Sequence, residues 1–405
     1  MGFVDPLTAI IVSFLFLGVM FYKRVNLGIT LNAAALLLAL LALDLPEIGN
    51  VIYETTISSL TISLVVATFG IMLLSLLYKE TKVIDVLSES LSKIVNNSKL
   101  IVSMLPAVMG LLPVGGGALM SAPLVEAETE KLGLKEDKKT YVNLWFRHTI
   151  FPVYPVSQFL ILTAMLTGLT LTSLILRQIP VVISMVAVGY LVGLWKTTKT
   201  PKTKEEENVK ANRGSELKRF GITFSPILAT IIAVIIFSID VSIAAFIGVA
   251  VLLMIAKPNL KTFTKPFKNR TIWGITLAAY GAFLLRNMAE AIEISQIFGS
   301  FVTNGNIDVL LLLTVIPAFL GAITGSPSGG IAISVSILTG IVSFTPKSAS
   351  LLYISSYLGY LVAPTHLCLV LTAEYFKCSL GKLYKYLIPS LIVSFATGIL
   401  VYLLV

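Results

Sequence analysis

The chain is poor in charged residues. Only 13% of its 405 residues are charged, about half the share of an ordinary globular domain, whereas 56% are hydrophobic. The mean hydropathy is +0.92, and many apolar runs approach the roughly 20 residues that cross a bilayer core as a helix. This composition excludes an ordinary soluble domain. A membrane β-barrel would need short segments of alternating hydropathy. The sequence does not show this pattern.

Cysteine and ATP-binding motifs are also scarce. The two cysteines, Cys368 inside an apolar run and Cys378 at its end, indicate neither a disulfide framework nor a zinc site. No Gly-Lys-Ser/Thr sequence of the Walker type occurs, so ATP drive within this chain is not indicated. The residues before Pro6 carry no positive charge, which argues against a cleavable signal peptide.

The net charge of +9 does not indicate a nucleic-acid partner. The basic residues stand in short loops between apolar runs, and this pattern sets the orientation of membrane helices. The sequence therefore predicts an all-α polytopic membrane protein.

Residues 1–195 are expected to form the first of two halves. Membrane spans are predicted over 7–22, 27–43, 57–78, 140–168 and 171–195. Segment 81–97 has apolar residues at helical spacing and predicts an amphipathic helix in the membrane interface. Residues 99–133 form two limbs too short to cross, which predicts a re-entrant hairpin. Pro152 and Pro155 remove backbone donors inside 140–168 and predict a broken helix.

Residues 220–405 repeat this order after a polar cytoplasmic linker over 196–219. A second hairpin is predicted over 308–343 and a second broken helix over 348–376, with further spans over 222–238, 241–256, 271–289 and 383–405. Gly116 and Gly329 are 213 residues apart (329 − 116), and Pro152 and Pro364 are 212 apart (364 − 152). Five crossings per half is an odd number, so the halves are expected to be an inverted repeat. The basic loops then place both chain termini outside and the linker inside. The alternative is chance placement of Gly and Pro in a helical bundle.

The hairpin tips carry glycine and proline at membrane depth. Irregular backbone is tolerated there only where it is buried in protein or lines a water-filled cavity. Glycine at a hairpin tip lets backbone amides approach a ligand. The helix N-terminus after each break favours binding of an anion. The backbone carbonyls before each break, which lack a helical hydrogen bond, favour binding of Na⁺. The alternative is close helix packing. The predicted substrate-binding residues are Gly115, Gly116, Gly117 and Ser121 in the first hairpin, and Ser326, Ser328, Gly329 and Gly330 in the second. Pro113 and Pro327 are expected to break the helices at the two hairpin tips. Any Na⁺ site is expected near Val114 and Thr324.

The predicted broken helices contain the polar and charged side chains that are most unusual for a membrane span. Arg147 and His148 lie roughly 15 Å into their span at helical rise, and a charge at that depth normally faces a partner or a cavity. Thr365 and His366 follow Pro364, and an imidazole there would titrate near neutral pH. The alternatives are an Arg147 that snorkels or pairs and a neutral His366 bonded to a local carbonyl. Asn143, Ser157 and Gln158 flank the first break as neutral hydrogen-bonding candidates.

The predicted order of elements resembles the ion transporter superfamily, which includes dicarboxylate and citrate carriers, arsenite pumps and gluconate permeases. In that order, three crossings are followed by an interfacial helix, a hairpin, a broken helix and a closing span, and the whole set is repeated in inverted orientation. The strings Pro113–Pro123, His148–Pro155 and Ala363–His366 are most similar to an uncharacterised archaeal and bacterial integral membrane family within it. The resemblance implies a scaffold domain, a transport domain made of the hairpins and broken helices, elevator-like transport and a homodimer. The Ser-Asn-Thr hairpin signature of the dicarboxylate branch is absent, so neither a dicarboxylate substrate nor that type of sodium site is implied.

These patterns predict a secondary active transporter, not an enzyme, that moves a small anionic solute across the cytoplasmic membrane. Coupling to H⁺ or Na⁺ is expected, with no resident cofactor. The expected partners are the solute, the lipid bilayer and a second copy of the chain. A cation/proton antiporter is one alternative, but it needs a membrane-centre Asp or Glu that is not found. An intramembrane hydrolase using Ser328 and His366 is another, although a Gly-x-Ser-x-Gly elbow is missing.

Overall fold

The computed structural model describes residues 4–95, 97–112, 117–197, 213–293 and 308–404, and within these ranges the regular structure is helical without strands. Six described segments are long and apolar enough to cross a membrane, which confirms the prediction of a helical, membrane-type protein. These segments are α4 (Ser59–Glu80), α8 with α9 (Glu136–Thr167), α10 with its π-helical end (Leu171–Leu194), α11 (Arg213–Ile235), α18 with α19 (Pro346–Tyr375) and α20 (Leu380–Leu404).

Three of the remaining expected spans form shorter apolar helices. Helices α1 (Pro6–Tyr22), α2 (Leu27–Ala42) and α12 (Val241–Ala256) have 16 or 17 residues, about 24–26 Å at helical rise. Helix α14 (Arg270–Ala291) has 22 residues. Helix α2 packs against α1 and α14, and α12 packs against α4 and α11. The shorter helices are therefore held alongside the long ones.

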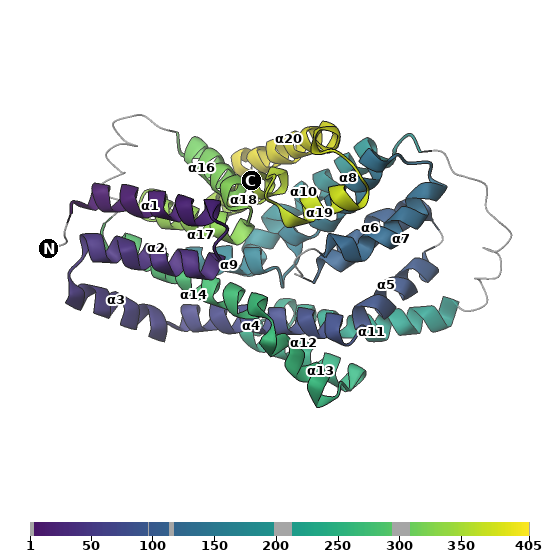
Figure 1. Cartoon of the computed structure of the whole chain (residues 1–405), viewed down its shortest axis with the longest axis horizontal. Helices are drawn as coiled ribbons and strands as arrows, with labels where there is room; N and C mark the ends of the chain where they lie inside the picture. The colour runs from purple at the N-terminus through teal and green to yellow at the C-terminus, as the bar shows by residue number, and fades with distance from the viewer. Residues whose placement is uncertain (1–3, 96, 113–116, 198–212, 294–307, 405) are drawn as a thin grey trace.

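The helices form two groups (Figure 1). The first helix group contains α1 to α4 and α11 to α14, with α3 spanning Leu45–Ile57 and α13 spanning Leu260–Thr264. The second helix group contains α6 to α10 and α16 to α20. Helix α5 (Val83–Ile94) contacts α4, α11 and α6, and so joins the groups at one end. Nearer the middle, α14 and α4 meet α9, and α14 also meets α17.

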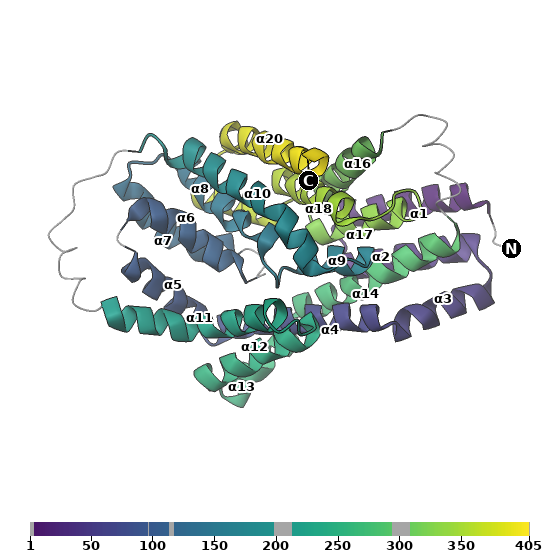
Figure 2. The same ribbon diagram turned by 180° about the vertical axis from the view of Figure 1, so that it is seen from behind.

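Two hairpins lie in the second helix group. Helices α6 (Ser98–Gly110) and α7 (Ala118–Lys131) pack against each other, as do α16 (Val309–Thr324) and α17 (Pro327–Leu338). The α6–α7 pair lies toward the right end of the long axis in Figure 1 and the α16–α17 pair toward the left, and the view from behind in Figure 2 agrees. Residues 113–116, which include Pro113, lie outside the described residues.

Both predicted helix breaks are confirmed. Helix α8 (Glu136–Thr149) ends before a 3-10 turn at Phe151–Val153, and α9 begins at Gln158. Helix α18 (Pro346–Val362) ends just before Pro364, and α19 (Leu367–Tyr375) follows. Proline has no amide hydrogen and disfavours the helical region for the residue before it, which favours these interruptions. Other prolines, such as Pro180 and Pro226, remain inside helices. The predicted interfacial helix of the first half is α5, and the corresponding stretch of the second half lies mostly in 294–307, outside the described residues.

One helix is not predicted by the sequence, and one expected boundary is wrong. The stretch after the second span forms α3, because Asp44 accepts a hydrogen bond from the amide of Glu47 and Pro46 stands in the first turn. The predicted linker also ends early, since α11 begins at Arg213. There Glu216 pairs with Arg219 at 3.2 Å and with Lys93 of α5 at 3.8 Å, so the polar residues support a helix.

Candidate functional site

A cavity of about 240 Å³ lies where the two helix groups meet. Its wall on the first group is mostly apolar, formed by Leu27, Leu31, Leu64, Thr68, Ile275, Ala278 and Ala279. Both helix breaks and the α16–α17 turn reach the opposite wall, which contains Arg147, His148, Phe151, Gln158, Phe159, Leu162, Gly325, Ser326, Ser328, Tyr360, Thr365, Leu367 and Cys368. A concave space with a few convergent polar groups is the usual form of a small-molecule site.

Arg147 brings a buried positive charge to this cavity. The side chain lies in the last turn of α8 and is 2% exposed. Its Nη2 donates a long hydrogen bond of 3.4 Å to the carbonyl of Leu112, and its Nη1 has no hydrogen-bond partner among the described residues. No Asp or Glu stands among the described lining residues. A buried charge without a counter-charge is costly, so this guanidinium is suited to a negatively charged ligand.

His148 is held in a defined orientation beside Arg147. Its Nδ1 lies 2.7 Å from the carbonyl oxygen of Leu144. A carbonyl only accepts, so Nδ1 carries the proton and Nε2 keeps its lone pair. The backbone carbonyl of His148 in turn accepts a hydrogen bond of 2.6 Å from the Tyr357 hydroxyl. Both the ring and its backbone are therefore positioned by local contacts.

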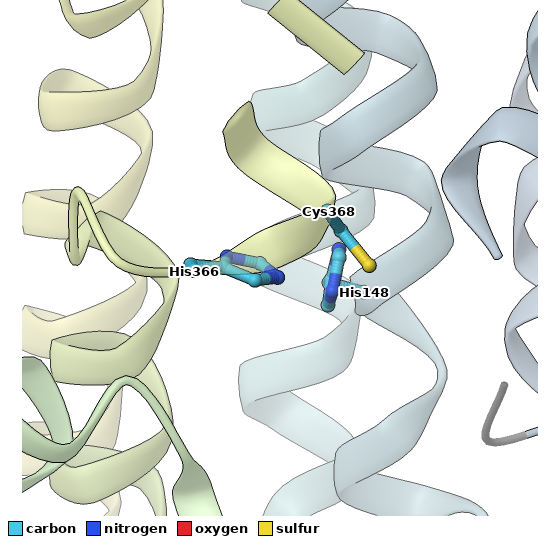
Figure 3. Close-up of side chains that lie close together, drawn as sticks. All are labelled: His148, His366 and Cys368. Atoms are coloured by element: carbon cyan, nitrogen blue, oxygen red, sulfur yellow. The ribbon is translucent and has the colours of Figure 1, made fainter. Parts of the chain in front are cut away.

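His366 comes to the same place from the second broken helix. It caps α19 directly after the proline break and is 1% exposed. Its ring stands edge-on to that of His148 at 4.8 Å, and the Tyr360 ring lies 4.0 Å away. Neither ring nitrogen of His366 makes a hydrogen bond of good geometry within the described part of the chain; the ring interacts only weakly with the Leu361 backbone and is not paired with Ser328. Cys368 lies next to the two histidines (Figure 3).

The turn between α16 and α17 is closed by its own side chains. The Thr324 hydroxyl donates to the carbonyl of Ser326 at 2.9 Å, and Gly325 has a φ of +58°, a value that favours glycine. Ser326 caps α17 by accepting from the amide of Gly329 at 3.5 Å. Ser326 and the nearby Ser328 line the cavity, as Thr365 does, whereas Thr324 does not.

Gly329 and Gly330 are buried in α17 and do not line the cavity. A Cβ on Gly330 would lie 2.7 Å from the Gly321 backbone of α16. One on Gly329 would lie 3.1 Å from the Cβ of Thr324. In this structure the two glycines allow close helix packing, which is the alternative that the sequence left open.

In the first hairpin, Pro113, Val114, Gly115 and Gly116 lie outside the described residues. Gly117 begins α7 with an ordinary φ of −60°. Ser121 is fully buried and donates to Asn143 Oδ1 at 2.7 Å, while Asn143 Nδ2 donates to the carbonyl of Ala118 at 2.9 Å. These bonds connect α7 to α8 away from the cavity lining.

Ser121 and Ser328 therefore allow a paired test. We expect Ser121→Ala to lower stability by about 1 kcal/mol through the lost hydrogen bond and to leave ligand affinity unchanged. Ser328→Ala should instead weaken the binding of a ligand in the cavity with little effect on stability, because Ser328 lines the cavity. Thermal unfolding and ligand titration of both variants measure these effects, and a loss of affinity in Ser121→Ala alone would reverse the assignment.

Several residues that line the cavity were not predicted from the sequence as site residues. Thr68 of α4, Tyr360 and Cys368 lie in the cavity wall. Thr68 carries no signal in the sequence, because it lies inside an apolar span of the other helix group. Gln158 was noted as flanking the break; it lines the cavity, and its Nε2 has no partner among the described residues.

Comparison with known proteins identifies a family but no established function. No curated protein matches the chain. A family model described as a protein of unknown function, DUF401, matches residues 7–405, nearly the full length. The chain therefore belongs to the DUF401 family.

Proposed function

We propose that the chain is a secondary active transporter that moves a small anionic solute across the cytoplasmic membrane, with Arg147 as its principal anion-binding group. The observation that carries this proposal is the buried Arg147 guanidinium in a cavity with no carboxylate among the described lining residues. Charge-assisted hydrogen bonds to an anion would compensate both the charge and the unpaired Nη1.

The two walls of the cavity support alternating access of the elevator type. Nearly all the polar lining groups belong to the second helix group, whereas the first group contributes an apolar wall with Thr68 as its one hydroxyl. If the second group carries the ligand and slides along the first, few polar contacts have to be broken. Movement of one helix group against another is how many secondary transporters alternate access.

The order of the helices supports an inverted repeat of five crossings and one hairpin per half. Helices α7 and α17 begin 209 residues apart (327 − 118), as do α9 and α19 (367 − 158) and α10 and α20 (380 − 171). The two hairpins also lie toward opposite ends of the long axis (Figure 1). This order supports our proposal that the chain is related to the ion transporter superfamily. We also propose that both termini lie outside, that the linker lies inside and that the working unit is a homodimer.

Flux into proteoliposomes tests the proposal. Purified protein should transport one or more of a panel of organic and inorganic anions when a gradient of H⁺ or Na⁺ is imposed, and dissipating that gradient with an ionophore should stop uptake. Comparing the two gradients identifies the coupling ion. Equal uptake by protein-free vesicles, or no gradient-dependent flux across the panel, would refute the proposal.

A further inference from the structure

Three potential metal ligands converge at the edge of the cavity. His148 comes from α8, and His366 and Cys368 come from the start of α19, 218 and 220 residues later (366 − 148 and 368 − 148). One ligand atom from each residue can be chosen so that all three lie within 4.8 Å of one another, and all three residues are buried. Figure 3 shows the His366 ring directed toward His148, with the Cys368 side chain beside them.

His366 gives independent evidence for a ligand. The residue is 1% exposed, yet neither ring nitrogen makes a hydrogen bond of good geometry in the described part of the chain, and the ring has only a weak interaction with the Leu361 backbone. Leaving a buried polar group unsatisfied costs about 1–3 kcal/mol, and native proteins rarely do so without a functional reason. A metal ion bound to one ring nitrogen would satisfy its lone pair, and the N–H of the other nitrogen would be left for the Leu361 backbone.

His148 already has the arrangement of a metal ligand. Histidines that bind metals usually donate their other ring N–H to a carboxylate or a backbone carbonyl, which fixes the tautomer. The Nδ1 of His148 donates to the carbonyl of Leu144 at 2.7 Å, so the lone pair of Nε2 is free to bind. The bond comes from within α8, so it holds the ring whether or not a metal is bound.

We propose that His148, His366 and Cys368 form a metal site for Zn²⁺. Two imidazoles and a thiolate are ligands that zinc prefers, and three protein ligands with one open position are typical of sites where zinc binds a further ligand. Zinc–nitrogen bonds of about 2.0–2.1 Å and zinc–sulfur bonds of about 2.3 Å place ligand atoms roughly 3.3–3.6 Å apart. Since the atoms lie within 4.8 Å of one another, each pair has to close by about 1.5 Å at most (4.8 − 3.3) when the ion binds.

The charges indicate what occupies the open position. His148 and Cys368 both line the cavity, as Arg147 does. Zinc with two neutral histidines and one thiolate has a net charge of +1, and no Asp or Glu stands among the described lining residues. An anion between the zinc and Arg147 would balance these charges. The assignment of an anion to the open position rests on the proposed function, whereas the metal site itself does not.

Cobalt titration of the purified full-length protein tests the site without any transport assay. Tag-free, metal-stripped protein in detergent, kept reduced, should bind one Co²⁺ per chain and develop a thiolate-to-cobalt absorption band in the near ultraviolet. Added Zn²⁺ should remove this band. Failure of the wild-type protein to produce the band would overturn the proposal, whatever the outcome of the flux experiments.

The chain contains its own matched control, because it has two free cysteines. Cys368→Ser should lose the band, whereas Cys378→Ser should keep it. His366→Asn and His148→Asn should each weaken Co²⁺ binding at least about tenfold. Retention of the band in Cys368→Ser would overturn the proposal. Zinc X-ray absorption of the wild-type protein needs no variant: two nitrogen ligands and one sulfur ligand are expected, and the absence of zinc–sulfur scattering would contradict the site.

Discussion

Arg147→Gln is expected to reduce gradient-driven anion flux about 100-fold. Among the described lining residues Arg147 is the only Lys or Arg. Removing one partner of a buried, hydrogen-bonded charge pair costs about 2–5 kcal/mol, and about 2.7 kcal/mol corresponds to a factor of 100. Glutamine keeps much of the side-chain length and a hydrogen-bonding end but removes the charge. The rate of anion uptake into proteoliposomes measures the effect.

The stability of this variant should not fall with its activity. Without an anion, the Arg147 charge is buried and uncompensated, so neutralising it is expected to leave the unfolding temperature unchanged or to raise it. Arg147→Lys should retain part of the flux, because it keeps the charge but loses the planar donor geometry. Arg286→Gln is the matched control, since Arg286 lies in α14 outside the cavity lining and 3.7 Å from Glu290. Normal flux by Arg147→Gln would remove Arg147 from the site.

Gly359→Ala is expected to destabilise the second helix group by about 1–3 kcal/mol through overpacking. Gly359 lies in α18, where a Cβ would press against the carbonyl group of Ala318 in α16, 2.7 Å from its carbon. Backbone atoms cannot rotate away as a flexible side chain can. The two helices would have to separate, and α18 ends at the break that positions Thr365 and His366. The thermal unfolding midpoint of the purified protein measures the loss.

Gly221→Ala provides the comparison, because a Cβ on Gly221 would meet nothing within 4 Å. Alanine is favoured over glycine inside a helix by about 1 kcal/mol. The unfolding midpoint of this variant should therefore stay equal or rise, while that of Gly359→Ala falls. A Gly359→Ala midpoint at or above the wild-type value would show that α16 and α18 can separate at little cost.

The metal site and the anion transport can be tested separately, although they involve adjacent residues. Cys368→Ser should abolish the cobalt band whether or not the protein transports anions. Arg147→Gln should abolish flux whether or not cobalt binds. Loss of both properties in both variants would instead indicate that the cavity has collapsed, which the unfolding midpoints would detect.

The sequence alone determined the class of protein and the positions of the breaks, because both follow from local physics. Long apolar runs need a bilayer or a large buried interior, and the prolines at 152, 155 and 364 favour a helix break, although prolines such as Pro180 and Pro226 remain inside helices. The burial of Arg147 and His148 was also predictable, since both lie deep in an apolar span. Helix α3 was not predicted, although Asp44 and Pro46 are favourable residues for starting a helix.

Only the tertiary structure decided which of these residues meet. Cys368 looked like an isolated thiol in an apolar run, because its neighbour His148 lies 220 residues earlier in the chain (368 − 148). Likewise Gly329, Gly330 and Ser121 looked like ligand contacts but lie in helix-packing contacts. Hydropathy and proline act within a few residues, whereas the direction of a side chain toward a cavity or a neighbour depends on how whole helices pack against each other.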